Sequence, residues 1–209
     1  MEPLLSLATG AGLGLAGGLA PGPLTALVFS QTLQYGAHEG AKVSLAPVIT
    51  DGPLLLLSAF AASWFAGSDV AFAVIGFVGS GFLVWLGLES FRAGPVEVDA
   101  VSAPAGGVVK AVLTNLLNPH PYLFWGAVGG PLVARAYEQG GLSVVSFLLG
   151  FFGVLCGTKL GMALFVDWAR PLLSSRAYVW IMRGLGLMMW FFAAGFFIDA
   201  VHRLGLLSG

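Results

Sequence analysis

The stretch from Gly18 to Pro53 constrains this chain more than any other, because it places helix-breaking residues and a carboxylate inside an apolar region. Pro21-Gly22-Pro23 interrupts the stretch near its start, and Asp51 follows near its end. Proline removes a backbone donor and clashes with the preceding helical turn. A membrane protein tolerates such broken backbone where it is buried in protein or lines a wet cavity, and an acid at that depth is a functional candidate. The stretch therefore predicts a broken helix beside a buried acid, which is typical of a transport site.

The composition indicates a multi-pass membrane protein. Of 209 residues, 57% are hydrophobic and only 9% are charged, whereas a soluble domain carries roughly 25% charged residues. The formal net charge of −1 gives no indication of a nucleic-acid partner. The single cysteine, Cys156, excludes a disulfide framework and is interpreted as a small core residue. We expect no cofactor and no metal, since His38, His120 and His202 are scattered along the chain.

Six apolar stretches, each near the roughly 20 residues that a bilayer requires, predict an all-α fold of six transmembrane helices. Their approximate bounds are 4–33, 43–65, 70–91, 108–134, 142–166 and 178–201. The polar segment 34–42 is expected to be a turn. The first stretch lacks a basic segment before it and is too long for a signal peptide, so we expect it to be kept as a membrane helix.

Two similar halves predict an inverted repeat. Residues 1–91 form the first three-helix repeat, 92–107 a linker and 108–209 the second repeat. The first helix of each repeat carries a proline break, and the second carries one charged residue, Asp51 or Lys159. Three helices per repeat place the halves in opposite orientations, which is the plan of many secondary transporters.

Lysine and arginine in the short loops predict the orientation, because these residues favour the cytoplasmic side. One side holds Lys42, Arg92, Lys110, Arg170, Arg176 and Arg183. The other side holds Arg135 and Arg203. We therefore expect a bacterial inner-membrane protein with both termini outside.

Asp51 and Lys159 are the charges expected near the middle of the bilayer, where each costs about 2.5 to 3.5 kcal/mol on insertion scales. One hypothesis is a switchable pair. Asp51, with its neighbour Thr50, would take up a proton or a substrate ammonium, and Lys159 would act as counter-charge or bind a carboxylate. A fixed structural ion pair is the alternative.

The two proline breaks are the other candidate site residues: Pro21, Gly22, Pro23, Asn118, Pro119 and His120. Breaks free backbone groups at membrane depth. The N-terminus of a half-helix suits a carboxylate, and freed carbonyl groups suit an ammonium, so paired breaks match an amino acid. Asn118 is a predicted helix cap. The alternative is a pair of hinges without ligand contact.

Two glycine ladders, Gly10/Gly14/Gly18 and Gly153/Gly157/Gly161, predict close helix packing. The sequence leaves open whether that packing lies within one chain or joins copies in a homo-oligomer.

Three segments carry a resemblance to a known family. They are Ala20-Pro21-Gly22-Pro23 with Ser30, Gly36, Gly40 and Asp51; the run 77–87 from Phe77 to Leu86-Gly87; and the Asn115–Pro121 segment with its Asn-Pro motif. Together they resemble the LysE/RhtB amino-acid exporters over nearly the whole chain. The resemblance implies efflux of amino acids or derivatives from the bacterial cytoplasm, driven by the proton gradient. Leu24 stands where members usually have Asn, and His120 where they usually have Lys, so no particular substrate is implied.

The leading hypothesis is a proton-coupled exporter of an amino acid or a related small metabolite, acting in the lipid bilayer. An inorganic-ion exporter and a non-transporting structural subunit are the alternatives. An intramembrane enzyme is disfavoured, because no Ser/His/Asp grouping or metal constellation is apparent.

Overall fold

The computed structural model describes residues 3–65, 69–92, 106–173 and 175–205, with the side chains of 56–65 and 175 outside the description. This part of the chain is helical almost throughout and contains no strand. The helices in order are α1 (Pro3–Leu19), α2 (Pro23–Tyr35), α3 (Ala37–Ser44), α4 (Ala46–Phe65), α5 (Asp69–Arg92), α6 (Gly107–Leu116), α7 (Pro119–Phe124), the π-helical turn η1 (Trp125–Gly129), α8 (Gly130–Glu138), α9 (Gly141–Ala169), the 3-10 turn η2 (Arg170–Leu172) and α10 (Ser175–Arg203).

Both predicted breaks are present. Helices α1 and α2 meet at a bend of 65°. The α2 helix begins at Pro23. Proline has no backbone N–H, but an N–H at the first helical position would have no partner within the helix, so no hydrogen bond is lost. In the second break α7 begins at Pro119, and the Asn118 side chain accepts a hydrogen bond of 3.0 Å from the His120 backbone N–H. The predicted cap at Asn118 is therefore confirmed.

The prediction of a turn over 34–42 was wrong, since residues 37–44 form helix α3. Gly36 separates α2 from α3 with a φ of 87°, a conformation that favours glycine. The polar residues of α3 lie on two faces. Glu39 is buried and Lys42 reaches back to it, with Lys42 Nζ 2.6 Å from Glu39 Oε1, whereas His38 is exposed. The polar composition of this segment suggested a turn. The burial of Glu39 depends on tertiary packing, which composition does not show.

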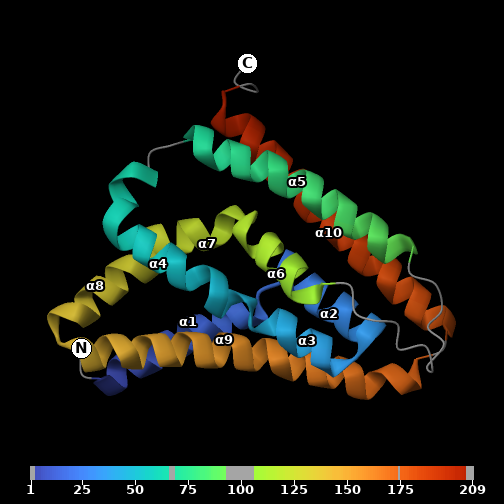
Figure 1. The fold of residues 1–209 in the computed structure, drawn as a ribbon, viewed down its shortest axis with the longest axis horizontal. Coiled ribbons are helices and arrows are strands. Elements are labelled where there is room, and N and C mark those ends of the chain that lie inside the picture. Colours follow the sequence, from blue (N-terminus) through green and yellow to red (C-terminus); the bar gives the residue numbers. More distant parts are fainter. Residues whose placement is uncertain (1–2, 66–68, 93–105, 174, 206–209) are drawn as a thin grey trace.

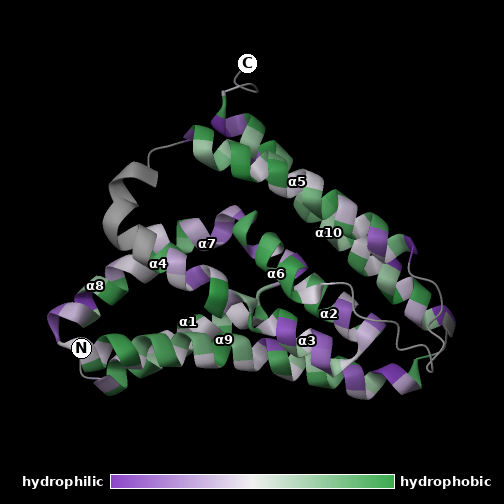
Figure 2. Ribbon diagram, in the orientation of Figure 1, coloured by the Kyte–Doolittle hydropathy of each residue, from purple (hydrophilic) through white to green (hydrophobic). Residues whose placement is uncertain are grey.

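The long helices pair across the chain (Figure 1). Helix α1 lies along α9, and α5 lies along α10. Figure 2 shows mostly hydrophobic residues along α9 and the α5–α10 pair, with hydrophilic residues on α3, on α8 and near helix ends. Within the described residues α5, α9 with η2, and α10 are long and apolar enough to cross a membrane, and the bent α1–α2 pair would make a fourth span. The chain is thus a multi-pass helical membrane protein, and the six-helix inverted repeat stays a prediction.

One glycine ladder accounts for the α1–α9 contact. A Cβ at Gly10 would lie 2.1 Å from the Phe147 carbonyl oxygen, and one at Gly14 would lie 2.3 Å from the Phe151 carbonyl oxygen. The two backbones therefore touch because these residues have no side chain. The second ladder, Gly153, Gly157 and Gly161, has open space where each Cβ would be. The predicted linker lies almost entirely outside the described residues.

Candidate functional site

Asp51 lies on α4 and is 5% exposed. Its Oδ1 accepts hydrogen bonds from Thr50 Oγ1 at 3.0 Å and from Asn115 Nδ2 at 2.6 Å. The same Asn115 nitrogen lies 2.5 Å from Thr50 Oγ1. The Thr50 hydroxyl has one proton, which it directs to Asp51 or to the Ala46 carbonyl oxygen 3.0 Å away. Hydrogen-bond donors around a carboxyl group favour its charged form, whereas burial away from water disfavours that form.

Two aromatic residues from the second break complete the surroundings of Asp51. The Tyr122 hydroxyl lies near the carboxyl group but donates to the Leu116 carbonyl oxygen at 2.8 Å, satisfying a group freed by the break. Trp125 is fully buried on the π-helical turn. Its indole N–H lies near Asp51 without reaching hydrogen-bond geometry with any described group. The Trp125 N–H is thus an additional hydrogen-bond donor beside the Asp51 carboxylate.

Lys159 lies on α9 and is 4% exposed. Its Nζ is 2.9 Å from Thr25 Oγ1 and 3.3 Å from the Gly18 carbonyl oxygen. The Thr25 hydroxyl donates in turn to the Ala20 carbonyl oxygen at 3.0 Å. Gly18 lies at the end of α1 and Thr25 in the first turn of α2, so the acceptors flank the first break, where freed carbonyl groups favour a cation.

Asp51 and Lys159 do not form an ion pair in this structure. In the described part of the chain, no carboxylate lies within 4.0 Å of Lys159 Nζ. The Cys156 thiol, one helical turn before Lys159, lies near enough to both charges to interact with them. Each charge also lies at the break of the opposite half: Asp51 beside α6 and α7, and Lys159 beside the end of α1.

The other predicted site residues are divided between the two breaks. Pro21, Gly22 and Pro23 lie at the first break, next to the Lys159 contacts. Asn118 and Pro119 lie at the second, where the Asn118 side chain is used as a cap. His120 is exposed, and its ring centroid lies 6.0 Å from that of Phe196 on α10. The structure therefore brings Thr50 to Asp51 but does not place His120 among their hydrogen-bond partners.

Sequence reasoning missed the residues that hold the two charges. Asn115 and Thr25 are their side-chain partners, and Trp125 lies beside Asp51. Asn115 stands three residues before the Asn-Pro motif, which was the available signal. A partly buried ion pair between Glu89 Oε1 and Lys110 Nζ, 2.5 Å apart, was also missed, because it joins α5 to α6 across the linker.

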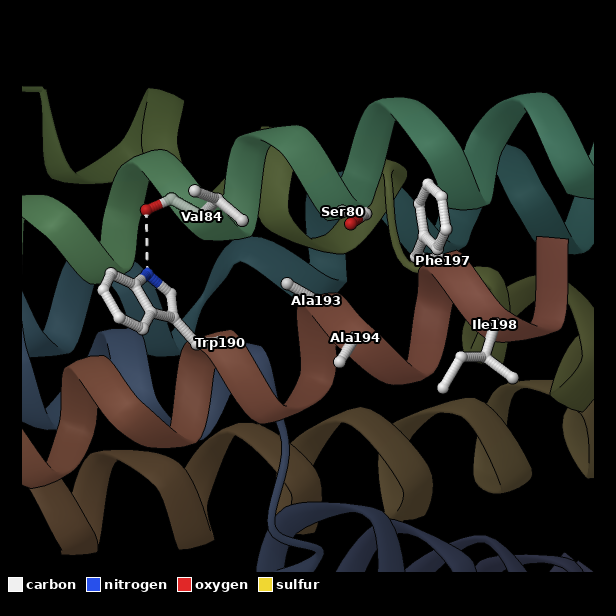
Figure 3. A pocket seen from close by; sticks show the side chains of 7 residues that line it. All are labelled: Ser80, Val84, Trp190, Ala193, Ala194, Phe197 and Ile198. Carbon is white, nitrogen blue, oxygen red and sulfur yellow. Dashed lines mark hydrogen bonds between the residues drawn. The ribbon is translucent and has the colours of Figure 1, made fainter. Parts of the chain in front are cut away.

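A groove of about 470 Å³ lies between α5 and α10 (Figure 3). Its lining residues are Ser80, Val84, Trp190, Ala193, Ala194, Phe197 and Ile198. The Trp190 N–H donates to the Val84 carbonyl oxygen at 3.2 Å, so the groove presents mainly apolar side chains. It holds neither Asp51 nor Lys159, and we do not assign the site to it.

Long apolar helices with opposite charges buried at two helix breaks define a class, the multi-pass membrane transport proteins. The model of the LysE type translocator family matches residues 15–200, and the chain belongs to this family. The assignment places the chain among translocators rather than enzymes, and the resemblance seen in the sequence is confirmed.

Curated relatives are similar over part of their length. A leucine efflux protein of Klebsiella pneumoniae subsp. pneumoniae is 31% identical over 113 residues, which cover 51% of this chain and 53% of the relative. A homoserine/homoserine lactone efflux protein of Salmonella typhi is 28% identical over 116 residues, covering 53% of this chain and 56% of the relative. An uncharacterized membrane protein of Pseudomonas aeruginosa is 29% identical over 161 residues, covering 68% and 74%. The first two matches span about half the length of each relative, and no solved structure matches the chain.

Proposed function

We propose that this protein is a secondary transporter that exports amino acids or related small metabolites across the bacterial inner membrane in exchange for protons. The observation that carries the proposal is the pair of buried, opposite charges that are not paired with each other. Membership of a translocator family and the names of the efflux relatives support it.

The two charges suit the two ends of a zwitterion. Asp51 offers a carboxylate to a substrate ammonium, and Lys159 offers an ammonium to a substrate carboxylate. Each protein charge is held by neutral groups, Asn115 and Thr50 at one break and Thr25 at the other. A buried charge without an opposite partner is costly, so a ligand that supplies both partners gains that energy on binding.

Proton exchange follows from competition at Asp51. A protonated carboxyl group is neutral and no longer attracts the ammonium group of a substrate. The site at Asp51 therefore binds either the proton or the substrate. Protons entering from the outside then displace substrate, and the inward proton gradient drives export.

The test measures internal and external amino-acid pools in cells that express the chain and are fed a panel of dipeptides. We expect one or a few amino acids to leave faster with the wild type, and Asp51→Asn to abolish that difference. The matched control is Asp69→Asn, which removes an exposed carboxylate paired with Arg203 at 3.2 Å. Full export by Asp51→Asn protein at normal membrane level would end the coupling role. If the wild type speeds the export of none of the amino acids, the result would favour an inorganic-ion exporter or a structural subunit instead.

Topology and assembly belong to the same proposal. The Lys/Arg-rich ends of α3, α5 and α6 face the cytoplasm, and both termini face outward. The ladder at Gly153, Gly157 and Gly161 is open on the outer face of α9, so it is the contact we propose for a homo-oligomer.

A further inference from the structure

One side chain of the second half holds two neighbouring residues of the first. Asn115 on α6 is 5% exposed, and its amide nitrogen lies 2.6 Å from Asp51 Oδ1 and 2.5 Å from Thr50 Oγ1. Both contacts go to α4. At the opposite break, Lys159 likewise joins the halves, through Thr25 and the Gly18 carbonyl oxygen.

The Asn115 contact depends on the charge of Asp51. An amide NH2 donates, so the 2.6 Å contact requires a lone pair on Asp51 Oδ1. Once Asp51 takes up a proton, the Asn115 amide no longer faces a charged acceptor, and a proton on Oδ1 itself turns that oxygen into a donor that the amide cannot bond. An asparagine side chain also carries a carbonyl oxygen, which can accept from the protonated acid after the amide rotates.

The other groups of the second half that lie near Asp51 do not offer this exchange as strongly. Trp125 has only an N–H donor, and the Tyr122 proton is committed to the Leu116 carbonyl oxygen. Cys156 on α9 is a weak donor and acceptor, and Lys159, beyond it, is held by Thr25 and Gly18. Asn115 is therefore the strong hydrogen-bonding group from the second half that can both donate to ionised Asp51 and accept from protonated Asp51.

We infer that Asn115 is a positioning residue that links the protonation of Asp51 to the contact between α4 and α6, so that proton uptake is transmitted to the opposite half of the transporter. The inference rests on the proposed function, and it adds a residue that acts through Asp51 rather than on the substrate. Loss of Asn115 uncouples the proton from transport but leaves the two charged ends of the site in place.

The experiment uses proteoliposomes of the full chain loaded with an equimolar mixture of the twenty L-amino acids, whose release is followed by mass spectrometry. Release is measured with equal pH on both sides, with an imposed pH gradient, and as exchange against the same mixture outside. For Asn115→Leu we expect the stimulation by the pH gradient, expressed relative to the variant's own exchange rate, to fall at least tenfold. For Asn115→Asp we expect the pH midpoint of release to move upward, because two adjacent carboxylates share a proton.

Thr50 and Thr32 supply the matched variants. Both are buried threonines that bond the carbonyl oxygen four residues earlier, but Thr32 bonds only Val28 in this way and does not contact Asn115. Thr50→Val should weaken the response to the pH gradient, Thr50→Ser should restore it, and Thr32→Val should leave it unchanged. These variants also test the inference if Asn115→Leu fails to reach the membrane.

The outcomes separate the two proposals. Wild-type release of one or more amino acids with an unchanged pH response in Asn115→Leu, or in Thr50→Val, overturns the role of Asn115 and leaves the exporter proposal intact. No release by wild type under any gradient overturns the exporter proposal, and the role of Asn115 falls with it.

Discussion

The two helix breaks share a Pro-x-Pro pattern, yet they hold opposite charges. At the first break, the end of α1 leaves carbonyl groups free, and Lys159 binds there through Gly18 and Thr25. At the second, the Asn118 cap uses the first backbone donor of α7, and the donors to Asp51 come from side chains. The comparison shows that the sign of the charge at a break depends on which end of a helix is left unsatisfied and how the next helix is capped.

The largest expected effect comes from exchanging the two charges. In the double variant Asp51→Lys/Lys159→Asp, a carboxylate faces carbonyl oxygens and an ammonium faces the donors Asn115 and Thr50. We expect export to fall below about a hundredth of wild type, since losing the partners of a buried charge costs about 3 to 5 kcal/mol. The measurement is amino-acid efflux normalised to protein in the membrane. Recovery of half the wild-type rate, above either single variant, would mean that the two residues act as an exchangeable ion pair.

A smaller effect is expected from the glycine that holds the first break in place. Gly14→Ala puts a methyl group 2.3 Å from the Phe151 carbonyl oxygen, so α1 must shift away from α9. We expect a loss of about 1 to 3 kcal/mol in stability, typical of overpacking. Gly12→Ala, on the open face of α1, should be neutral or stabilising by up to about 1 kcal/mol. Thermal unfolding in detergent distinguishes the two, and equal destabilisation would contradict the packing of α1 on α9.

The smallest effect is expected at the cap of the second break. Asn118→Ala removes the acceptor for the His120 N–H and should cost about 1 kcal/mol, whereas Asn118→Asp keeps an acceptor and should stay close to wild type in stability. The melting temperature of each variant in detergent checks this. A loss with Asp as large as that with Ala would show that the side chain does more than cap α7.

The breaks and the two charges were predictable, because proline, glycine and intramembrane charges act locally and are costly wherever they lie. The partners were not, since Asn115 reaches Asp51 from 64 residues away and Lys159 reaches Thr25 from 134 residues away. Helix α3 was missed for a related reason. Glu39 is buried by residues that lie far from it in the sequence, so the neighbouring residues alone do not reveal its burial. The possible Asp51–Lys159 pair was suggested by symmetry, but in the structure each charge is satisfied at a different break.

The contact of Gly10 and Gly14 with α9 has a mechanical consequence. Because α1 belongs to residues 1–91 and α9 to residues 108–209, this close backbone contact joins the two predicted repeats, and the α5–α10 pair joins them likewise. A rocking motion of one repeat against the other would have to drag α1 across the carbonyl groups of Phe147 and Phe151. A motion that carries α1 together with α9, and α5 together with α10, preserves both helix–helix contacts. In a motion of that kind, each moving unit would contain helices from both sides of the linker.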